Sequence, residues 1–198
     1  MLKRSLLLAG GIALASWCVA PAFAADVFSL SSTTFKDGTM LPKKAANANT
    51  SGNNPNCVGE NVSPQFSWTG TPEGTKSFVF LMEDPEGRGG AGVHHMVIYG
   101  IAPTTTSFAE GDLSKPSDKF VGGKATQGTG IYNGPCTPAN VQPHHYTFTL
   151  VATDFDPKEL PPGLTRPEVL DKIAPNNGAP VHAKGSAGMV GLFVKPAN

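Results

Sequence analysis

The sequence predicts an all-β fold, a β-sandwich of two antiparallel sheets with a small peripheral helix near the C-terminus. Two observations support this prediction. The 23 glycines and 18 prolines are spread throughout the chain, as expected where many turns join short strands. Short runs of apolar, aromatic and β-branched residues recur between these turns, whereas helical periodicity is scarce.

Six segments have the composition of strands. Segment 77–82 is nearly continuous in apolar character, so we expect a central strand that is buried on both faces. Clusters of turn residues, such as 51–55 and 71–74, separate neighbouring segments. The expected strands are residues 27–30, 66–68, 77–82, 95–101, 146–152 and 189–194.

One helix is expected after residue 165. Thr165 has the position of an N-cap, and Glu168, three residues later, completes a capping box. Pro175 and Gly178 then end the helix. The apolar stripe that would pack on the rest of the protein is Val169, Leu170 and Ile173.

Residues 1–24 have the pattern of a cleaved signal peptide. Lys3 and Arg4 precede an apolar stretch over 6–19, and Ala22-Phe23-Ala24 is a small-x-small cleavage motif. The apolar stretch is too short for a good transmembrane anchor. We therefore expect a periplasmic or secreted protein, not an integral membrane protein, with residues 25–198 as a single domain.

The charge of the expected mature chain excludes some classes of partner. Removal of the signal peptide changes the formal net charge from zero to minus two, and no basic run remains. A near-neutral chain of this kind argues against binding to nucleic acid or to an anionic membrane surface.

The expected mature chain contains two cysteines, Cys57 and Cys136. In an oxidising compartment two such cysteines are expected to form a disulfide. The alternatives are a pair of metal-binding thiolates or a reactive thiol.

Four of the five histidines form two adjacent pairs, each at the start of an expected strand. Side chains alternate across a strand, so only one member of each pair can point into a shared pocket. In the second pair, His144 shares the apolar face with Tyr146, and His145 lies on the opposite face. In the first pair the pattern does not choose between His94 and His95, because both faces of the following strand are apolar.

These residues suggest a pocket for a small oxyanion. Two imidazoles, a phenol and the backbone N–H groups of the Gly134-Pro135 turn would donate hydrogen bonds to the anion. Asp84 would repel an anion directly, so we expect it to accept from one imidazole and fix its tautomer. The alternative is a buried polar network in which the groups only satisfy one another.

Several motifs follow one another in a recognisable order along nearly the whole expected mature chain. They are Phe28-Ser29-Leu30-Ser31, Asp37-Gly38, Gly59-Glu60-Asn61-Val62-Ser63-Pro64, Phe66-Ser67-Trp68, Asp84-Pro85-Glu86, His94-His95, Gly134-Pro135 and His144-x-Tyr146. This ordered set resembles the phosphatidylethanolamine-binding protein family, in particular its bacterial Raf-kinase-inhibitor-like branch.

The resemblance implies a two-sheet antiparallel sandwich with a small anion pocket at one end. It also selects His95 from the first histidine pair. Members of the family are described as binding phosphate-bearing head groups such as phosphoethanolamine, and some inhibit kinases or proteases. The implied ligand-binding residues are Asp84, His95, Gly134, Pro135, His144 and Tyr146.

The chain departs from the family pattern at three positions. Glu86 stands where the family usually has a second Asp, and His145 stands where it usually has Arg. Because Arg is a permanent cation and His is not, an ion pair is lost or becomes dependent on pH. Cys136 stands where many relatives have a second proline.

The function expected from these residues is a non-catalytic binding module for a small anion or a phospholipid head group, with no cofactor. The sequence contains no nucleophile with a paired base, no P-loop and no cofactor fingerprint. One alternative is a metal-dependent enzyme that uses Asp84, His95 and His144. A second alternative is a protein that docks on a kinase- or protease-like partner and inhibits it, with a purely structural pocket.

Overall fold

The structure is a computed structural model that describes residues 26–49, 56–139 and 141–197. The expected signal peptide and the turn cluster at 51–55 lie outside these residues. In the described part, the chain forms two β-sheets and little helix, which confirms the predicted fold class.

The smaller sheet has three strands in the order β1-β3-β6, and all its pairings are antiparallel. The larger sheet has six strands in the order β2-β9-β8-β4-β5-β7. Its pairings are antiparallel except that β2 runs parallel to β9. The strands are β1 (Ser29–Ser31), β2 (Thr39–Met40), β3 (Phe66–Thr69), β4 (Ser77–Asp84), β5 (Val93–Ile101), β6 (Ser107–Phe108), β7 (Val121–Gly122), β8 (His144–Thr153) and β9 (Ala183–Phe193).

Each of the six expected strands overlaps a strand of the structure. The last one is longer than predicted, because β9 begins at Ala183 rather than at 189. Its early residues include Gly185, Ser186 and Gly188, which lack the apolar signal used to find strands. Strands β2, β6 and β7 were not predicted, since two residues are too few to show a periodic pattern.

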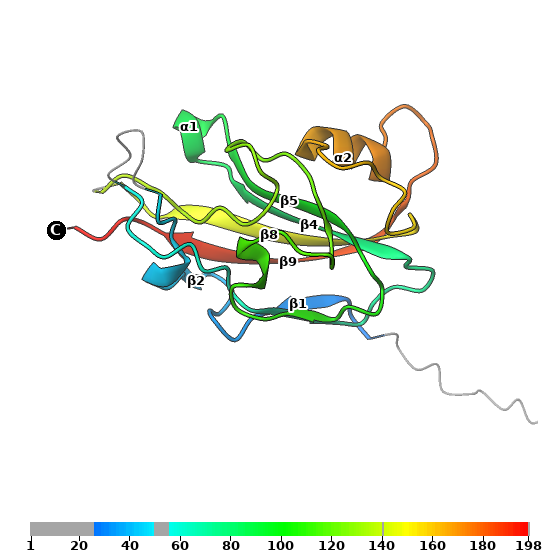
Figure 1. The fold of residues 1–198 in the computed structure, drawn as a ribbon, viewed down its shortest axis with the longest axis horizontal. Helices are drawn as coiled ribbons and strands as arrows, with labels where there is room; N and C mark the ends of the chain where they lie inside the picture. The colour runs from blue at the N-terminus through cyan, green and yellow to red at the C-terminus, as the bar shows by residue number, and fades with distance from the viewer. Residues whose placement is uncertain (1–25, 50–55, 140, 198) are drawn as a thin grey trace, which may run out of the picture.

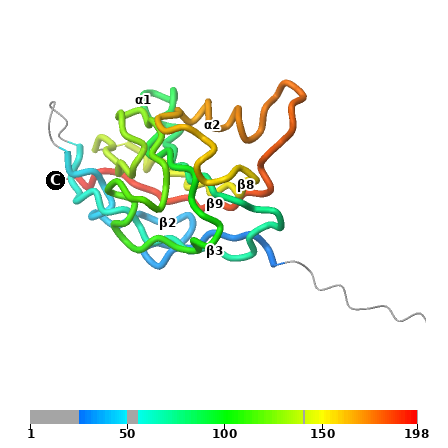
Figure 2. The backbone as a smooth tube through the Cα atoms, turned by 45° about the vertical axis from the view of Figure 1, so that its right-hand side comes forward, coloured from blue at the N-terminus to red at the C-terminus, as the bar shows by residue number. Residues whose placement is uncertain are grey.

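The main core lies between the two sheets, and a second apolar layer lies on the other face of the larger sheet. Phe66 of β3 packs against Phe80 of β4 and Phe148 of β8, with ring centroids 5.0 and 4.9 Å apart. Strand β4 is buried along almost its whole length, as predicted. Figures 1 and 2 show the smaller sheet on one side of the larger sheet and the helices α1 and α2 on the other.

Helix α2 (Arg166–Ile173) begins and ends close to the predicted positions. The Glu168 carboxylate accepts a hydrogen bond from the backbone N–H of Thr165, and the Thr165 side chain accepts one from the backbone N–H of Glu168, which together form the predicted capping box. Val169 and Ile173 are buried in the apolar layer that covers the outer face of the larger sheet. The helix therefore covers the sheet, and its first residue, Arg166, pairs with Glu83 near the end of β4.

Short helical turns and a disulfide connect the strands. Helix α1 (Gly87–Gly90) is a single turn between β4 and β5, and two short 3-10 turns occupy Lys43–Ala45 and Asp112–Ser114. A disulfide joins Cys57 to Cys136, with their Cα atoms 4.7 Å apart. This confirms the predicted bridge and rules out the alternative of two free or metal-binding thiols.

Candidate anion-binding site

A small pocket lies where β4 ends and where β5 and β8 begin. The antiparallel pairings place Glu83 of β4 opposite His94 of β5 and Thr147 of β8, so the strand ends meet at one place. The pocket has a volume of about 150 Å³. Its lining residues are Asp84, Gly87, Arg88, Val93, His95, Gln127, Cys136, Thr137, Pro138, His144 and Tyr146.

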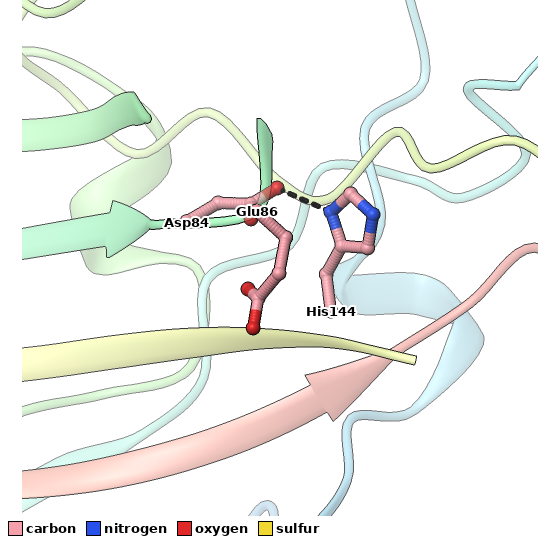
Figure 3. Close-up of side chains that lie close together, drawn as sticks. All are labelled: Asp84, Glu86 and His144. Carbon is pink, nitrogen blue, oxygen red and sulfur yellow. Dashed lines mark hydrogen bonds and ion pairs between the residues drawn. The ribbon is translucent and has the colours of Figure 1, made fainter. Parts of the chain in front are cut away.

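Asp84 is buried and accepts several hydrogen bonds at once. Its Oδ1 accepts from the backbone N–H of Gly87 at 2.9 Å, and its Oδ2 accepts from His144 Nδ1 at 2.8 Å. Figure 3 shows Asp84 facing the ring of His144. Besides burial, the charge of this carboxylate contributes to the raised pKa of the nearby Tyr146 hydroxyl. Asp84 thus holds other groups of the pocket in position, which is the role predicted for it.

Strand alternation orients the second histidine pair as predicted. Tyr146 is buried and His144 half-buried on the pocket side of β8, whereas His145 is exposed. Burial and the nearby charge of Asp84 raise the pKa of Tyr146, so its hydroxyl keeps its proton at physiological pH. His145 instead contacts Glu86, with its Nδ1 2.7 Å from Oε1 and its backbone N–H donating to Oε2.

The first histidine pair is now resolved. His95 is buried against Tyr146, with the ring planes nearly perpendicular and the centroids 5.2 Å apart. His94 is turned away from this pocket toward Glu83, which also pairs with Arg166 of α2. Burial lowers the pKa of His95, so its imidazole is neutral at neutral pH.

The hydrogen bonds fix the tautomer of His95. Its Nδ1 lies 2.6 Å from the backbone oxygen of Asn133, and a carbonyl oxygen can only accept a hydrogen bond. The proton of neutral His95 is therefore on Nδ1, and Nε2 is a hydrogen-bond acceptor. In this arrangement neutral His95 offers a ligand an acceptor at Nε2, whereas the sequence-based expectation was that both imidazoles donate to an anion.

Gly134 and Pro135 are placed differently from the other expected ligand-binding residues. Neither lines the small pocket, and the N–H of Gly134 donates to Asn61 Oδ1 at 2.8 Å. Gly134 lines a neighbouring pocket of about 410 Å³, and the oxygen of Pro135 accepts from the N–H of Asn47. A Cβ at Gly134 would overlap the Ala45 carbonyl, so this glycine allows two backbone segments to pack closely.

Arg88 lines the pocket but was not singled out from the sequence. It lies in the glycine-rich turn after Asp84 and is exposed. The available signal was a lone cation within a run of glycines that directly follows the Asp84 motif. Gln127 and Thr137 also line the pocket, and neither belongs to a motif that predicts this position.

Asp84, His95 and His144, which the alternative of a metal-dependent enzyme would use, do not form a group of the kind that binds a metal ion. Among the described residues, the group whose ligand atoms lie within 4.8 Å of one another is Asp84, Glu86 and His144, without His95. In Figure 3 the carboxylate of Glu86 turns toward β8 rather than toward the His144 ring. The hydrogen bond between Asp84 and His144 already uses the facing atoms of these two side chains.

Comparison with known proteins agrees with the fold and the motifs. Residues 31–186 match the model of the family described as phosphatidylethanolamine-binding protein. The chain belongs to this family. Its crystallised relative YbcL of Escherichia coli, titled a new member of the mammalian PEBP family, superposes with a TM-score of 0.69 at 26% identity. That alignment covers 84% of this chain and 97% of YbcL.

Two further relatives illustrate the range of the family. LppC of Mycobacterium tuberculosis, whose name marks it as a candidate lipoprotein, is 33% identical over 87% of this chain and 75% of its own length. A UPF0098 protein of Methanothermobacter thermautotrophicus is 35% identical over 69% of this chain and 85% of its own length. Within the described residues of this PEBP-family chain, no helix is long and apolar enough to cross a membrane.

Proposed function

We propose that this protein is a non-catalytic binding protein for a small phosphate-type anion, which it holds in the pocket beside Asp84, His95, His144 and Tyr146. The observation that carries the proposal is the partly buried hydrogen bond between Asp84 and His144 inside a polar pocket at the end of an otherwise apolar core. Pockets with a few convergent polar groups on apolar walls are the usual sites for small ligands.

The chemistry of the lining residues supports an anionic ligand. Arg88 is a permanent cation, and His144 offers Nε2, which becomes a donor when the ring is protonated. Asp84 already accepts from its neighbours, so its charge is partly compensated before a ligand arrives. A phosphate-bearing head group fits this set of charges, and the name of the family points to the same ligand chemistry.

Calorimetric titration with phosphoethanolamine tests the proposal. We expect saturable binding to the oxidised protein and its loss in His144→Ala. His145→Ala is the matched control, because this neighbouring ring lies outside the pocket. Absence of binding to the unchanged protein, or equal weakening by both substitutions, would count against the pocket as an anion site.

We also propose that the protein is exported and acts in the periplasm or outside the cell. The Lys3-Arg4 start, the apolar stretch and the Ala22-Phe23-Ala24 motif support this location, as does the disulfide. Intact mass spectrometry of protein from the producing cells should give a chain that begins at Ala25. A cytoplasmic protein that keeps residues 1–24 would contradict export.

A divalent-metal site is the second candidate function, because one possible ligand atom of each of Asp84, Glu86 and His144 lies within 4.8 Å of the other two. Metal analysis of protein purified without chelators distinguishes the two candidates. Stoichiometric metal that is lost in Glu86→Gln would favour a metal site. A metal-free protein that binds phosphoethanolamine would favour the anion pocket.

A further inference from the structure

Arg88 has an unusual backbone position beside the pocket. It belongs to α1, but its φ of 55° and ψ of 37° lie in the left-handed region that few residues other than glycine adopt. Gly89 and Gly90 follow it, also with positive φ. Backbone strain of this kind tends to be retained where a side chain must be held in a particular place.

Arg88 is the one Lys or Arg among the described residues that line the pocket. Its guanidinium makes no ion pair or hydrogen bond with any other described residue, which leaves its donors free for a ligand. The two neighbouring carboxylates are engaged elsewhere, Asp84 with His144 and Glu86 with His145. A guanidinium presents paired N–H donors that match two phosphate oxygens.

His95 adds a hydrogen-bond acceptor to the same pocket. Its Nδ1 proton is used by the Asn133 carbonyl, so Nε2 offers a lone pair. His95 is one of the residues that line the pocket. The pocket therefore combines a permanent cation with an acceptor that needs a hydrogen from the ligand.

We propose that Arg88 binds the phosphate of the ligand and that the pocket selects a phosphate monoester over the phosphodiester of an intact phospholipid. This inference rests on the proposed anion-binding function and names the class of ligand. A monoester has a second pKa of about 6, so near that pH much of it carries both a negative charge and a P–OH hydrogen. A diester has the charge but no such hydrogen, and its oxygens would face the lone pair of His95 Nε2.

Methyl phosphate and dimethyl phosphate form a matched pair of probes, since they differ by one methyl group and one ionisable hydrogen. Calorimetric titrations at pH 6 should use the oxidised protein, Arg88→Gln and Lys158→Gln. Lys158 is an exposed cation that follows the far end of β8, so Lys158→Gln controls for the loss of one positive charge. Phosphoethanolamine is titrated in parallel as the probe of the proposed function.

We expect the affinity for methyl phosphate to be at least about tenfold higher than the affinity for dimethyl phosphate. Arg88→Gln should weaken the binding of methyl phosphate by about tenfold or more, and Lys158→Gln should leave this binding unchanged.

Equal binding of the two esters, or no effect of Arg88→Gln, would overturn the inference but would not contradict the proposed anion pocket. Binding of phosphoethanolamine without binding of methyl phosphate would also overturn it, because the ammonium group would then carry recognition. No binding of any probe would overturn both the inference and the proposed function.

Discussion

Two neighbouring histidines of β8 pair with two carboxylates of the same turn, and the two pairs differ mainly in burial. His144 lies 2.8 Å from Asp84, and His145 lies 2.7 Å from Glu86. The side chains of the first pair are 17% and 5% exposed, whereas those of the second are 54% and 40% exposed. Strand alternation produces this difference, because it sends consecutive side chains to opposite faces.

The same contact therefore has different consequences on the two faces of β8. In the buried pair, removal of one partner leaves a polar group without water or a substitute partner, which is costly. In the exposed pair, water and salt screen the charges and replace lost hydrogen bonds. We therefore assign the pocket to the buried pair and treat the exposed pair as a weak connection between β8 and the turn after β4.

Reduction of the disulfide should lower the stability of the protein more than any other change. One of its cysteines, Cys136, lines the pocket of the buried pair. The two cysteines are 79 positions apart, so in a chain-entropy model reduction lowers the free energy of unfolding by about 4 kcal/mol. Urea unfolding with and without reductant measures this change. A Cys57→Ser/Cys136→Ser variant should not respond to reductant. Unchanged stability, or two free thiols in unfolded and unreduced protein, would contradict the account.

Removal of the buried carboxylate should have the next largest effect. Asp84→Ala leaves the Gly87 N–H and the His144 ring without their acceptor, so we expect the free energy of unfolding to fall by about 3 kcal/mol. Urea unfolding at pH 7 checks this value, with Glu86→Ala as the matched variant of the exposed pair. Similar losses of stability in the two variants would show that burial does not make the Asp84 pair more important for stability than the Glu86 pair.

His95 should make stability depend on pH on the buried side. Because burial lowers the pKa of folded His95, the unfolded chain takes up a proton more readily below the ordinary histidine pKa of about 6.5. The free energy of unfolding should be highest above that pH and fall as the pH drops below it, by at most about 1.4 kcal/mol per pH unit for one group.

Urea unfolding between pH 5 and 8 measures this dependence. His95→Gln should flatten the curve below pH 6.5, while His145→Gln serves as the control on the exposed face. A curve that is flatter in the His145 variant than in the His95 variant would reverse the assignment of the two faces.

The exposed pair should give the smallest effect. Burial is the largest single contribution and raises the pKa of Glu86, but the hydrogen bonds with His145 together outweigh it, so the pKa is lowered. The stability that this pair contributes is present above the unfolded pKa of Glu86 and is lost as the pH falls through the folded one. We expect His145→Ala to raise the Glu86 pKa in an NMR titration and to change the free energy of unfolding by less than about 1 kcal/mol. A larger loss of stability would mean that the contact between His145 and Glu86 stabilises the protein more than its exposure indicates.

Much of the fold follows from local patterns in the sequence. The buried strand β4 has a continuous apolar run, and the capping box of α2 is visible at Thr165 and Glu168. The two-residue strands β2, β6 and β7 could not be predicted, because their pairing depends on partners far away in the chain. The parallel pairing of β2 with β9 is of this kind.

The candidate site was predictable where alternation or motif order carried the information. Alternation placed His144 and Tyr146 on the inner face, and the family resemblance selected His95. The hydrogen bond from the Gly134 N–H to Asn61 was not predictable, because it joins residues 73 positions apart. Nor was the tautomer of His95, because it depends on a carbonyl that only the folded chain brings near.

The assignment of the pocket to the buried pair can be tested by NMR of the imidazole nitrogens during a titration with phosphoethanolamine. We expect saturable shifts of the Nε2 resonances of His95 and His144, with the exposed His145 nearly unchanged. Shifts confined to His145, or no saturable shift in any of the three rings, would contradict the assignment of the buried pair as the anion pocket.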